Sequence, residues 1–274
     1  AACEGMDGVV HVGGAAGIWG SWRIFHETNT KGTRYVIDGC LRHRVPRLVF
    51  TSSPSVVFDG CDQCGLDERA PYPRRWLSPY PRSKALAERM VLAANGHGGL
   101  ATCALRPHLV WGPRDRSLLP RLVARAKSGK LRRVGDGENL VDAVYVENAA
   151  AAHVRAYEVL SPDSPAAGKA YFIGQGEPVK CWEWINQLLA VAGAPPVEKS
   201  VPFATAWRVG RLCELYYTLF ACRSEPPMTR FLAAQLAKSH YYDITRAERD
   251  LGYRPEVSTD EGLRRLRAWW ERER

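Results

Sequence analysis

A tyrosine and a lysine stand four residues apart in the run Tyr80-Pro81-Arg82-Ser83-Lys84. On a helix this spacing places both side chains on one face, one turn apart. A tyrosine with its ordinary pKa of about 10 exchanges protons poorly near neutral pH, but a lysine ammonium one turn away favours the phenolate and lowers that pKa. The pair therefore predicts general acid–base chemistry at a substrate oxygen, which accelerates reactions roughly 10²–10⁴-fold.

A hydroxyl that could hold the same substrate oxygen is expected from the run Thr51-Ser52-Ser53-Pro54-Ser55. This run follows the apolar residues 48–50, which are typical of a buried strand. Ligands of open α/β sheets bind at the carboxyl ends of the strands. The strand before the serines and the helix that carries Tyr80 therefore have to meet at one sheet edge.

The remaining elements follow from the alternation of apolar runs and helical periodicity. Apolar runs that are too continuous for a half-solvated sheet indicate a parallel sheet covered on both faces, and so an α/β fold with a doubly wound sheet. Residues 1–177 are expected to form this domain, with segments of a smaller lobe interleaved after residue 107. Residues 178–274 are expected to form that mainly helical, substrate-binding lobe. Strands are predicted at 9–12, 47–52, 101–106, 144–146 and 170–174, and helices at 29–42, 80–94, 118–128 and 148–160.

The sheet is predicted to be incomplete at its N-terminal side. A dinucleotide-binding sheet opens with a strand, a glycine fingerprint and a helix. Here the first strand is followed by Gly13-Gly14-Ala15-Ala16-Gly17, which does not match that fingerprint. Either the chain starts part-way through such a domain or it is not a dinucleotide enzyme, and the Tyr80/Lys84 pair favours the first.

The charge and the cysteines of the chain limit the kinds of partner and ligand that we expect. The net charge is +9, but the basic residues are scattered among acidic ones without a long run of one sign, which argues against nucleic acid. Eight cysteines fit free thiols in a reducing cytoplasm, the expected location. Cys61 and Cys64 have C-x-x-C spacing but no second ligand pair, so no metal is expected. No stretch approaches the roughly 20 apolar residues that span a bilayer.

The chain resembles the extended short-chain dehydrogenases, and within them the 3β-hydroxysteroid dehydrogenase/isomerase family. The resemblance rests on motifs that occur in family order along the chain. It is strongest to the bacterial 2-alkyl-3-oxoalkanoate reductases of olefin biosynthesis, and it extends to sterol-4α-carboxylate 3-dehydrogenases. The matching runs are 49–56, 80–84, 105–107, 111–115, 135–142, 146–150 and 168–172, with 16–21 and 228–232 pointing to the bacterial reductases.

The resemblance implies a Rossmann-like fold, an NAD or NADP cofactor with NADP slightly favoured, and roles for individual residues. Tyr80 would donate and accept the proton with Lys84 as its partner, and Ser53 would supply the hydroxyl ahead of Ser52 or Ser55. Asn29 would tie the active-site segments together. The cofactor would be held by Gly13, Gly14, Ala15, Thr51, Ser52, Tyr80, Lys84, Pro107, Leu109 and Val110.

The implied reaction interconverts a secondary alcohol and a ketone on a large apolar substrate, either a long-chain β-hydroxy/β-keto acid or a 3β-hydroxysteroid or sterol. Two alternatives stay open: a nucleotide-sugar epimerase or dehydratase that uses the same Tyr/Lys machinery, and a truncated homologue without catalysis. The aromatic-rich stretch 201–222 is predicted to be an amphipathic helix that lines an apolar pocket, with peripheral membrane contact as the alternative. Relatives often dimerise through helices of the sheet domain, so a homodimer is an expectation.

Overall fold

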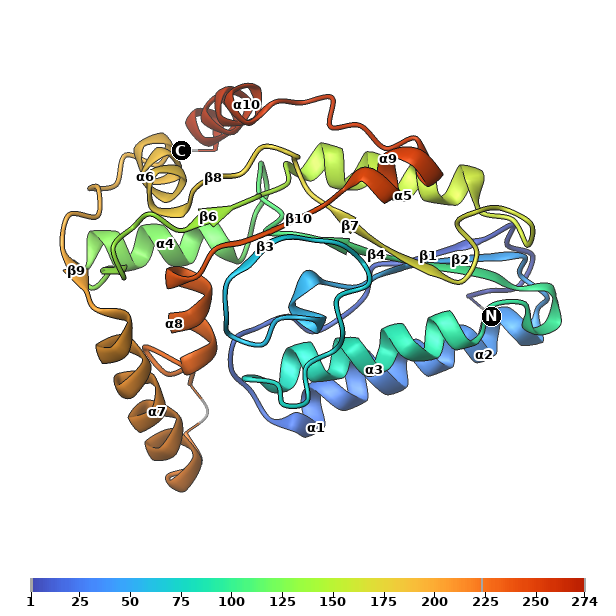
Figure 1. Cartoon of the computed structure of the whole chain (residues 1–274), viewed down its shortest axis with the longest axis horizontal. Coiled ribbons are helices and arrows are strands. Elements are labelled where there is room, and N and C mark those ends of the chain that lie inside the picture. The colour runs from blue at the N-terminus through green and yellow to red at the C-terminus, as the bar shows by residue number, and fades with distance from the viewer. Residues whose placement is uncertain (1, 223, 274) are drawn as a thin grey trace.

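The centre of the molecule is a four-stranded sheet in which every strand is parallel to its neighbours. The computed structural model describes residues 2–222 and 224–273. The strand order is β1-β2-β4-β7, so the chain crosses over between strands as a doubly wound fold requires (Figure 1). The four strands are β1 (Val9–His11), β2 (Arg47–Thr51), β4 (Ala101–Pro107) and β7 (Lys169–Ile173).

Helices cover both faces of this sheet because alternate side chains of each strand point to opposite sides. On β2, Leu48 and Phe50 pack with residues of α2 (Gly32–Arg42) and α3 (Pro79–Ala93), whereas Val49 packs with residues of α5 (Val146–Val159). The nearly continuous apolar runs are therefore explained by burial on two sides, as predicted.

The helix predicted at 29–42 starts earlier than expected. It begins as α1 (Trp22–Phe25), passes through a π-helical turn η1 (His26–Lys31) and continues as α2. π-helical turns occur frequently at functional sites, and this one carries Asn29.

The strand predicted at 144–146 is wrong. Tyr145 makes a single isolated bridge to Trp111, and α5 already begins at Val146. The Trp111 N–H donates to the Val144 carbonyl and the Val146 N–H donates to the Trp111 carbonyl, so the two segments touch at one point. The short apolar run reflects burial beside Trp111 rather than strand pairing.

A second, mixed sheet flanks the first and joins distant parts of the chain. Its strand order is β3-β10-β6-β8, with β6 and β8 antiparallel. Two further strands, β5 and β9, pair in parallel. These strands are β3 (Gln63–Leu66), β10 (His240–Tyr242), β6 (Leu140–Val141), β8 (Val179–Lys180), β5 (Arg133–Val134) and β9 (Ser200–Val201).

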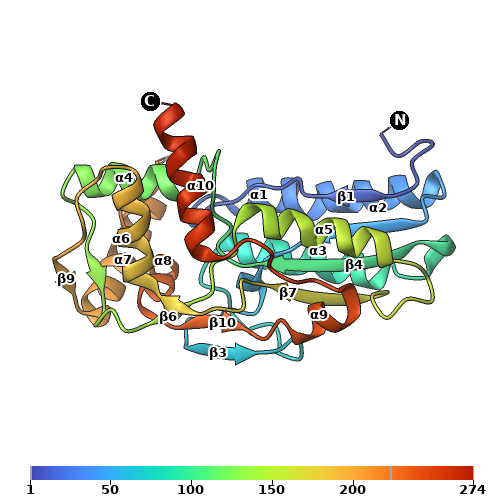
Figure 2. The same cartoon turned by 90° about the horizontal axis from the view of Figure 1, so that it is seen from above.

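The other helices gather at one end of the molecule, around a core that contains Trp111, Trp184 and Leu188 (Figure 2). Short 3₁₀ turns, η2 and η3, follow β2 and precede β4. The helices are α4 (Leu118–Lys127), α6 (Cys181–Val191), α7 (Phe203–Leu219), α8 (Arg230–Ala237) and α10 (Thr259–Arg272), and the turns are η2 (Pro54–Val56) and η3 (His97–Gly99). Within the described ranges, no helix is long and apolar enough to cross a membrane.

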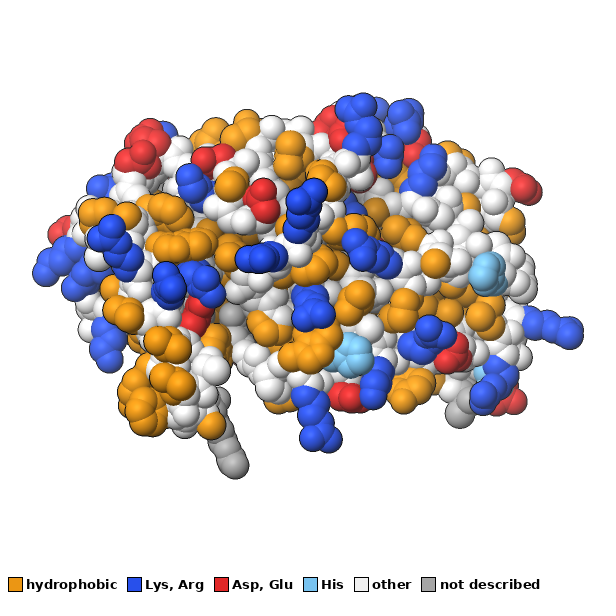
Figure 3. Space-filling view, turned by 60° about the horizontal axis from the view of Figure 1, so that its bottom comes forward, with side chains coloured by type: hydrophobic (Ala, Val, Ile, Leu, Met, Phe, Trp, Pro, Cys, Tyr) orange, Lys and Arg blue, Asp and Glu red, His pale blue; other side chains and the backbone are white. Residues whose placement is uncertain are grey.

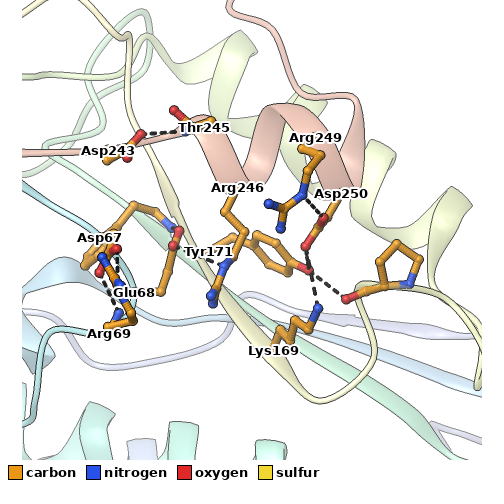
Figure 4. Close-up of polar contacts among 12 residues, drawn as sticks. Asp67, Glu68, Arg69, Lys169, Tyr171, Asp243, Thr245, Arg246, Arg249 and Asp250 are labelled. Atoms are coloured by element: carbon orange, nitrogen blue, oxygen red, sulfur yellow. Dashed lines mark hydrogen bonds and ion pairs between the residues drawn. The ribbon is translucent and has the colours of Figure 1, made fainter.

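The last part of the chain returns to the main sheet through α9 (Thr245–Leu251). Figure 4 shows the contacts that fasten it: the Tyr171 hydroxyl on β7 donates to Asp250 at 3.1 Å, and Arg249 Nε donates to the other carboxylate oxygen at 2.7 Å. Burial raises the pKa of Asp250, but hydrogen bonds from Arg249 and Tyr171 outweigh burial and lower it below its usual value. The division at residues 177/178 stays a prediction, and α9 lies with the sheet.

Candidate active site

Tyr80 and Lys84 lie on the first turns of α3, where Pro79 occupies a position that tolerates a missing N–H. Lys84 is 5% exposed, and its ammonium donates to the Thr51 carbonyl at 2.5 Å and lies 4.2 Å from the centre of the Phe50 ring. Tyr80 is partly exposed and packs edge-on against Phe25, with the ring centres 6.0 Å apart. The pair is thus fixed at the carboxyl end of β2.

The electrostatics of this pair differ from the sequence-based prediction. Burial raises the pKa of Tyr80, opposed by a hydrogen bond with Ser53, whereas we predicted that Lys84 would lower it. Lys84 does not lower the pKa of Tyr80 because its ammonium points to the Thr51 carbonyl. Burial also lowers the pKa of Lys84 to about 8, with the Glu88 carboxylate opposing this effect. In this structure Tyr80 therefore holds its proton at neutral pH.

The three candidate serines differ in the groups that surround them. The Ser53 hydroxyl lowers the pKa of Tyr80 against the effect of burial, and its Oγ lies 2.8 Å from Ser55 Oγ and accepts from the Ser55 N–H. Ser52 is 4% exposed and faces the buried carboxylate of Glu88 instead. Of the three serines, Ser53 is therefore the one that acts on Tyr80.

Asn29 ties the loop after β1 to the helix that carries Tyr80. Its Oδ1 accepts from the Ala15 N–H at 2.7 Å, and its Nδ2 donates to the Ala15 carbonyl at 2.9 Å and to Ser83 Oγ at 2.9 Å. Ser83 Oγ in turn donates to the Tyr80 carbonyl at 2.7 Å. A single 1% exposed side chain thus fixes the position of the loop relative to Tyr80.

The loop passes close to Lys84 at Gly14. A Cβ added to Gly14 would lie 3.1 Å from Asn29 Oδ1 and 3.8 Å from Lys84 Nζ, so a side chain would fill the space beside the ammonium. Glycine keeps this space open next to hydrogen-bond donors, which fits the ribose and nicotinamide of a dinucleotide cofactor. The Thr51 side chain points elsewhere, because its Oγ1 lies 2.7 Å from His153 Nε2, so Thr51 faces the site through its carbonyl.

The segment after β4 contributes strained backbone at the end of the neighbouring strand. Pro107 closes β4 opposite Ile173, Leu109 adopts a left-handed conformation with φ 42°, and Val110 is 39% exposed. A positive φ costs a branched, bulky residue free energy, and such strain concentrates at functional sites.

Two buried polar pairs behind the site were not predicted. Arg106 on β4 forms two hydrogen bonds with Glu88, which lies two turns beyond Tyr80 on the same face of α3. Burial raises the pKa of Glu88, but the ion pair with Arg106 outweighs burial and lowers it. His108 also contacts His240 of β10 at 2.9 Å between ring nitrogens. The spacing Tyr80–Lys84–Glu88 was a readable signal for the first pair, whereas nothing local indicates the second.

A groove of about 1650 Å³ opens beside the site, between α7 and the segments 18–24 and 77–79. Figure 3 shows the hollow next to the projecting lobe that α7 forms at lower left. Ser78 and Pro79, the two residues directly before Tyr80, belong to its wall, and so do apolar residues such as Trp19 and Leu215. The groove therefore reaches the two residues that directly precede Tyr80.

The chain matches a known protein family and several named relatives. Residues 1–203 match the 3-beta hydroxysteroid dehydrogenase/isomerase family. The 2-alkyl-3-oxoalkanoate reductase of Stenotrophomonas maltophilia (strain K279a) is 51% identical over 97% of this chain and 81% of its own length. The decarboxylating sterol-4-alpha-carboxylate 3-dehydrogenase of Homo sapiens is 34% identical over 96% of this chain and 72% of its own.

Among solved structures, the DesIV double mutant of Streptomyces venezuelae, a dTDP-glucose 4,6-dehydratase with NAD and DAU bound, superimposes with a TM-score of 0.73. It is 25% identical and covers 98% of this chain and 74% of its own. The structure of gox2253 has a TM-score of 0.77 at 23% identity, covering 99% of this chain and 80% of its own, and so shares the fold.

Proposed function

Since this chain belongs to the 3-beta hydroxysteroid dehydrogenase/isomerase family and is an NAD(P)-dependent oxidoreductase of CH–OH groups, we propose that Tyr80, Lys84 and Ser53 interconvert a ketone and a secondary alcohol on a long-chain 3-oxo acid. The observation that carries this proposal is the convergence of the three side chains at the end of β2. Ser53 acts on the pKa of Tyr80, and the Lys84 ammonium is fixed on the Thr51 carbonyl at the same strand end.

In the reducing direction the protein holds and moves one proton. The Ser53 hydroxyl and the Tyr80 phenol donate hydrogen bonds to the ketone oxygen, and Tyr80 releases its proton to that oxygen as negative charge develops there. Burial raises the pKa of Tyr80, which keeps the phenol protonated before the reaction, as proton donation requires. The nicotinamide cofactor, when bound, supplies the hydride. Oxidation runs the same steps backwards, with the phenolate accepting the proton.

Several residues of this chain would hold the cofactor. Lys84 and the Thr51 carbonyl would bind the ribose, and Gly14 leaves space beside the ammonium. Gly13 and Ala15 belong to the same loop, whose position Asn29 sets. Pro107, Leu109 and Val110 would face the nicotinamide from the neighbouring strand end. We propose NADP as the preferred form, as the resemblance to the bacterial reductases implies.

The substrate class follows from the relatives and from the groove. The reductase from Stenotrophomonas is named for a 3-oxoalkanoate with a 2-alkyl branch, and the human relative for a sterol carboxylate. In both substrates the carboxylate is attached to the carbon next to the one that bears the reacting oxygen. The volume and apolar walls of the groove suit two long alkyl chains. The nucleotide-sugar alternative draws support only from more distant solved structures.

The test is to oxidise a stable 2-alkyl-3-hydroxyalkanoate with the purified protein, in parallel assays with NADP and NAD, and to follow formation of the reduced cofactor. We expect turnover of the hydroxy acid, and turnover with NADP that exceeds turnover with NAD. A 3β-hydroxysteroid and a UDP-sugar serve as the comparison substrates. Turnover or tight binding of the UDP-sugar without oxidation of either hydroxylated lipid would contradict the proposal.

We further propose that α7 contacts an anionic lipid surface. It carries a helical stripe of exposed apolar side chains, among them Leu212, Tyr216 and Leu219, which are 65%, 54% and 71% exposed, and Leu212 also belongs to the groove wall. The orange side chains on the α7 lobe in Figure 3 belong to this region. The stripe borders the groove, and the chain carries a net charge of +9. An apolar substrate could therefore pass from the bilayer into the groove without crossing water.

A further inference from the structure

The groove beside Tyr80 carries an excess of positive charge. Three arginines and two glutamates belong to its wall: Arg208, Arg211, Arg230, Glu214 and Glu225. Both carboxylates already have cationic partners. Glu214 accepts from Arg230 Nε at 2.7 Å and from the Arg230 N–H, and Glu225 pairs with Arg121, which lies outside the groove wall. Within the described residues, Arg208 and Arg211 form no ion pair and remain as two uncompensated charges.

These two arginines lie one turn apart on the face of α7 that borders the groove, together with Leu215 and Thr218. Trp207, the neighbour of Arg208, packs in the cluster that contains Ile18 and Leu77. Leu77 directly precedes Ser78 and Pro79. The N-terminal half of α7 is thereby held at the same end of the groove as the residues that lead into Tyr80.

We propose that Arg208, assisted by Arg211, binds the carboxylate of the substrate and so makes the enzyme specific for 3-oxo or 3-hydroxy acids over neutral ketones and alcohols. This inference rests on the proposed function and deepens it. In such an acid a single carbon separates the carboxylate from the carbon that carries the reacting oxygen. A cation that binds the carboxylate at this end of the groove therefore also positions the reacting carbon.

Arginine suits this task because its planar guanidinium presents parallel donors that match both oxygens of a carboxylate. The apolar surroundings lower the local dielectric once the alkyl chains have displaced water, which strengthens the ion pair. Arg230 is not free to bind a substrate carboxylate, because its guanidinium is paired with Glu214. The same charge distribution is unfavourable for a neutral steroid, since binding it would desolvate two guanidinium groups without compensation.

The test compares a 2-alkyl-3-hydroxyalkanoate with its methyl ester, which removes the charge and keeps the shape. For the wild-type protein we expect kcat/KM for the acid to exceed that for the ester by about tenfold or more, the value typical of a charge-assisted pair. In Arg208→Met this ratio falls towards one, mainly through a higher KM for the acid. Arg211→Met gives a smaller decrease, and Arg208→Lys retains part of the preference.

Arg34→Met is the matched control, because Arg34 is an exposed arginine on α2 outside the groove wall. It should leave the acid-to-ester ratio unchanged. Thermal unfolding of each variant separates loss of recognition from loss of folding. An unchanged ratio in the Arg208→Met/Arg211→Met double variant, with the wild type still oxidising the acid, overturns the inference but leaves the proposed function standing. A wild type that oxidises neither acid nor ester overturns the proposed function itself.

Discussion

Lys84 carries its charge in a place with almost no water. Its ammonium contacts the Thr51 carbonyl and the face of the Phe50 ring, and the Glu88 carboxylate opposes the effect of burial on its pKa. Desolvation disfavours the charged form of a buried amine. Lys84 is therefore poised to lose its proton within the range in which enzymes are assayed, which makes its role measurable.

Burial lowers the pKa of Lys84 to about 8, so the fraction of ammonium falls as the pH rises through that value. We expect kcat/KM, which reports the free enzyme, to decrease above about pH 8. The check is a pH profile of ketone reduction. The Lys84→Arg variant keeps its positive charge at every assayed pH, so the decrease in its kcat/KM should move to a higher pH. A wild-type profile that stays flat well above pH 8 would show that the ammonium is not needed.

For single residues, the sequence was most informative where reactive residue types occur at a spacing that a regular element fixes. The i, i+4 relation of Tyr80 and Lys84 and the hydroxyls after β2 could be read directly, because a helix and a strand end have fixed geometry. The direction of the Lys84 side chain could not be read. It depends on the Thr51 carbonyl and on the Gly14 loop, which come from other parts of the chain.

At the level of elements, long periodic segments were predicted well, but the pairing of short strands that lie far apart in the sequence was not. The helix predicted at 80–94 is α3 (Pro79–Ala93), and the strand predicted at 101–106 lies within β4 (Ala101–Pro107). The second sheet was not predicted, because β10 pairs with β3 across more than half of the chain. The contact between His108 and His240 depends on that pairing and leaves no local signal.

The proposed role of α7 can be tested by substitutions on its exposed side. We expect the wild-type protein to co-sediment with vesicles that contain phosphatidylglycerol, because the exposed stripe buries apolar area worth about 25 cal/mol per Å². The double variant Leu212→Ser/Leu219→Ser should lose most of this binding. Val154→Ser on α5, a 55% exposed position away from α7, should not.

Two results would contradict the proposal for α7. One is a wild-type protein that stays in the supernatant at every vesicle concentration. The other is light scattering that shows a dimer which the Leu212→Ser/Leu219→Ser variant dissociates, since a second copy of the chain would then cover the stripe.

For the whole molecule, the sheet and the lobe have separate tasks. The parallel sheet brings the ends of β1, β2 and β4 together, and α7 of the lobe forms a groove with the segments 18–24 and 77–79. The fold class could be predicted because two-sided burial imposes continuous apolar runs on the strands. The shape of the groove could not, since α7 and the segment 18–24 lie far apart in the sequence and meet only in the folded chain.

The central claim is that Tyr80 transfers the proton at the reacting oxygen. The most direct measurement is steady-state reduction of a 2-alkyl-3-oxoalkanoate by the wild type and by Tyr80→Phe, with cofactor affinity determined separately by fluorescence. We predict that Tyr80→Phe binds the cofactor as the wild type does and loses about 10²–10⁴-fold in kcat, the contribution of a general acid. A Tyr80→Phe variant that keeps its cofactor affinity and reduces the ketone at the wild-type rate would contradict the account.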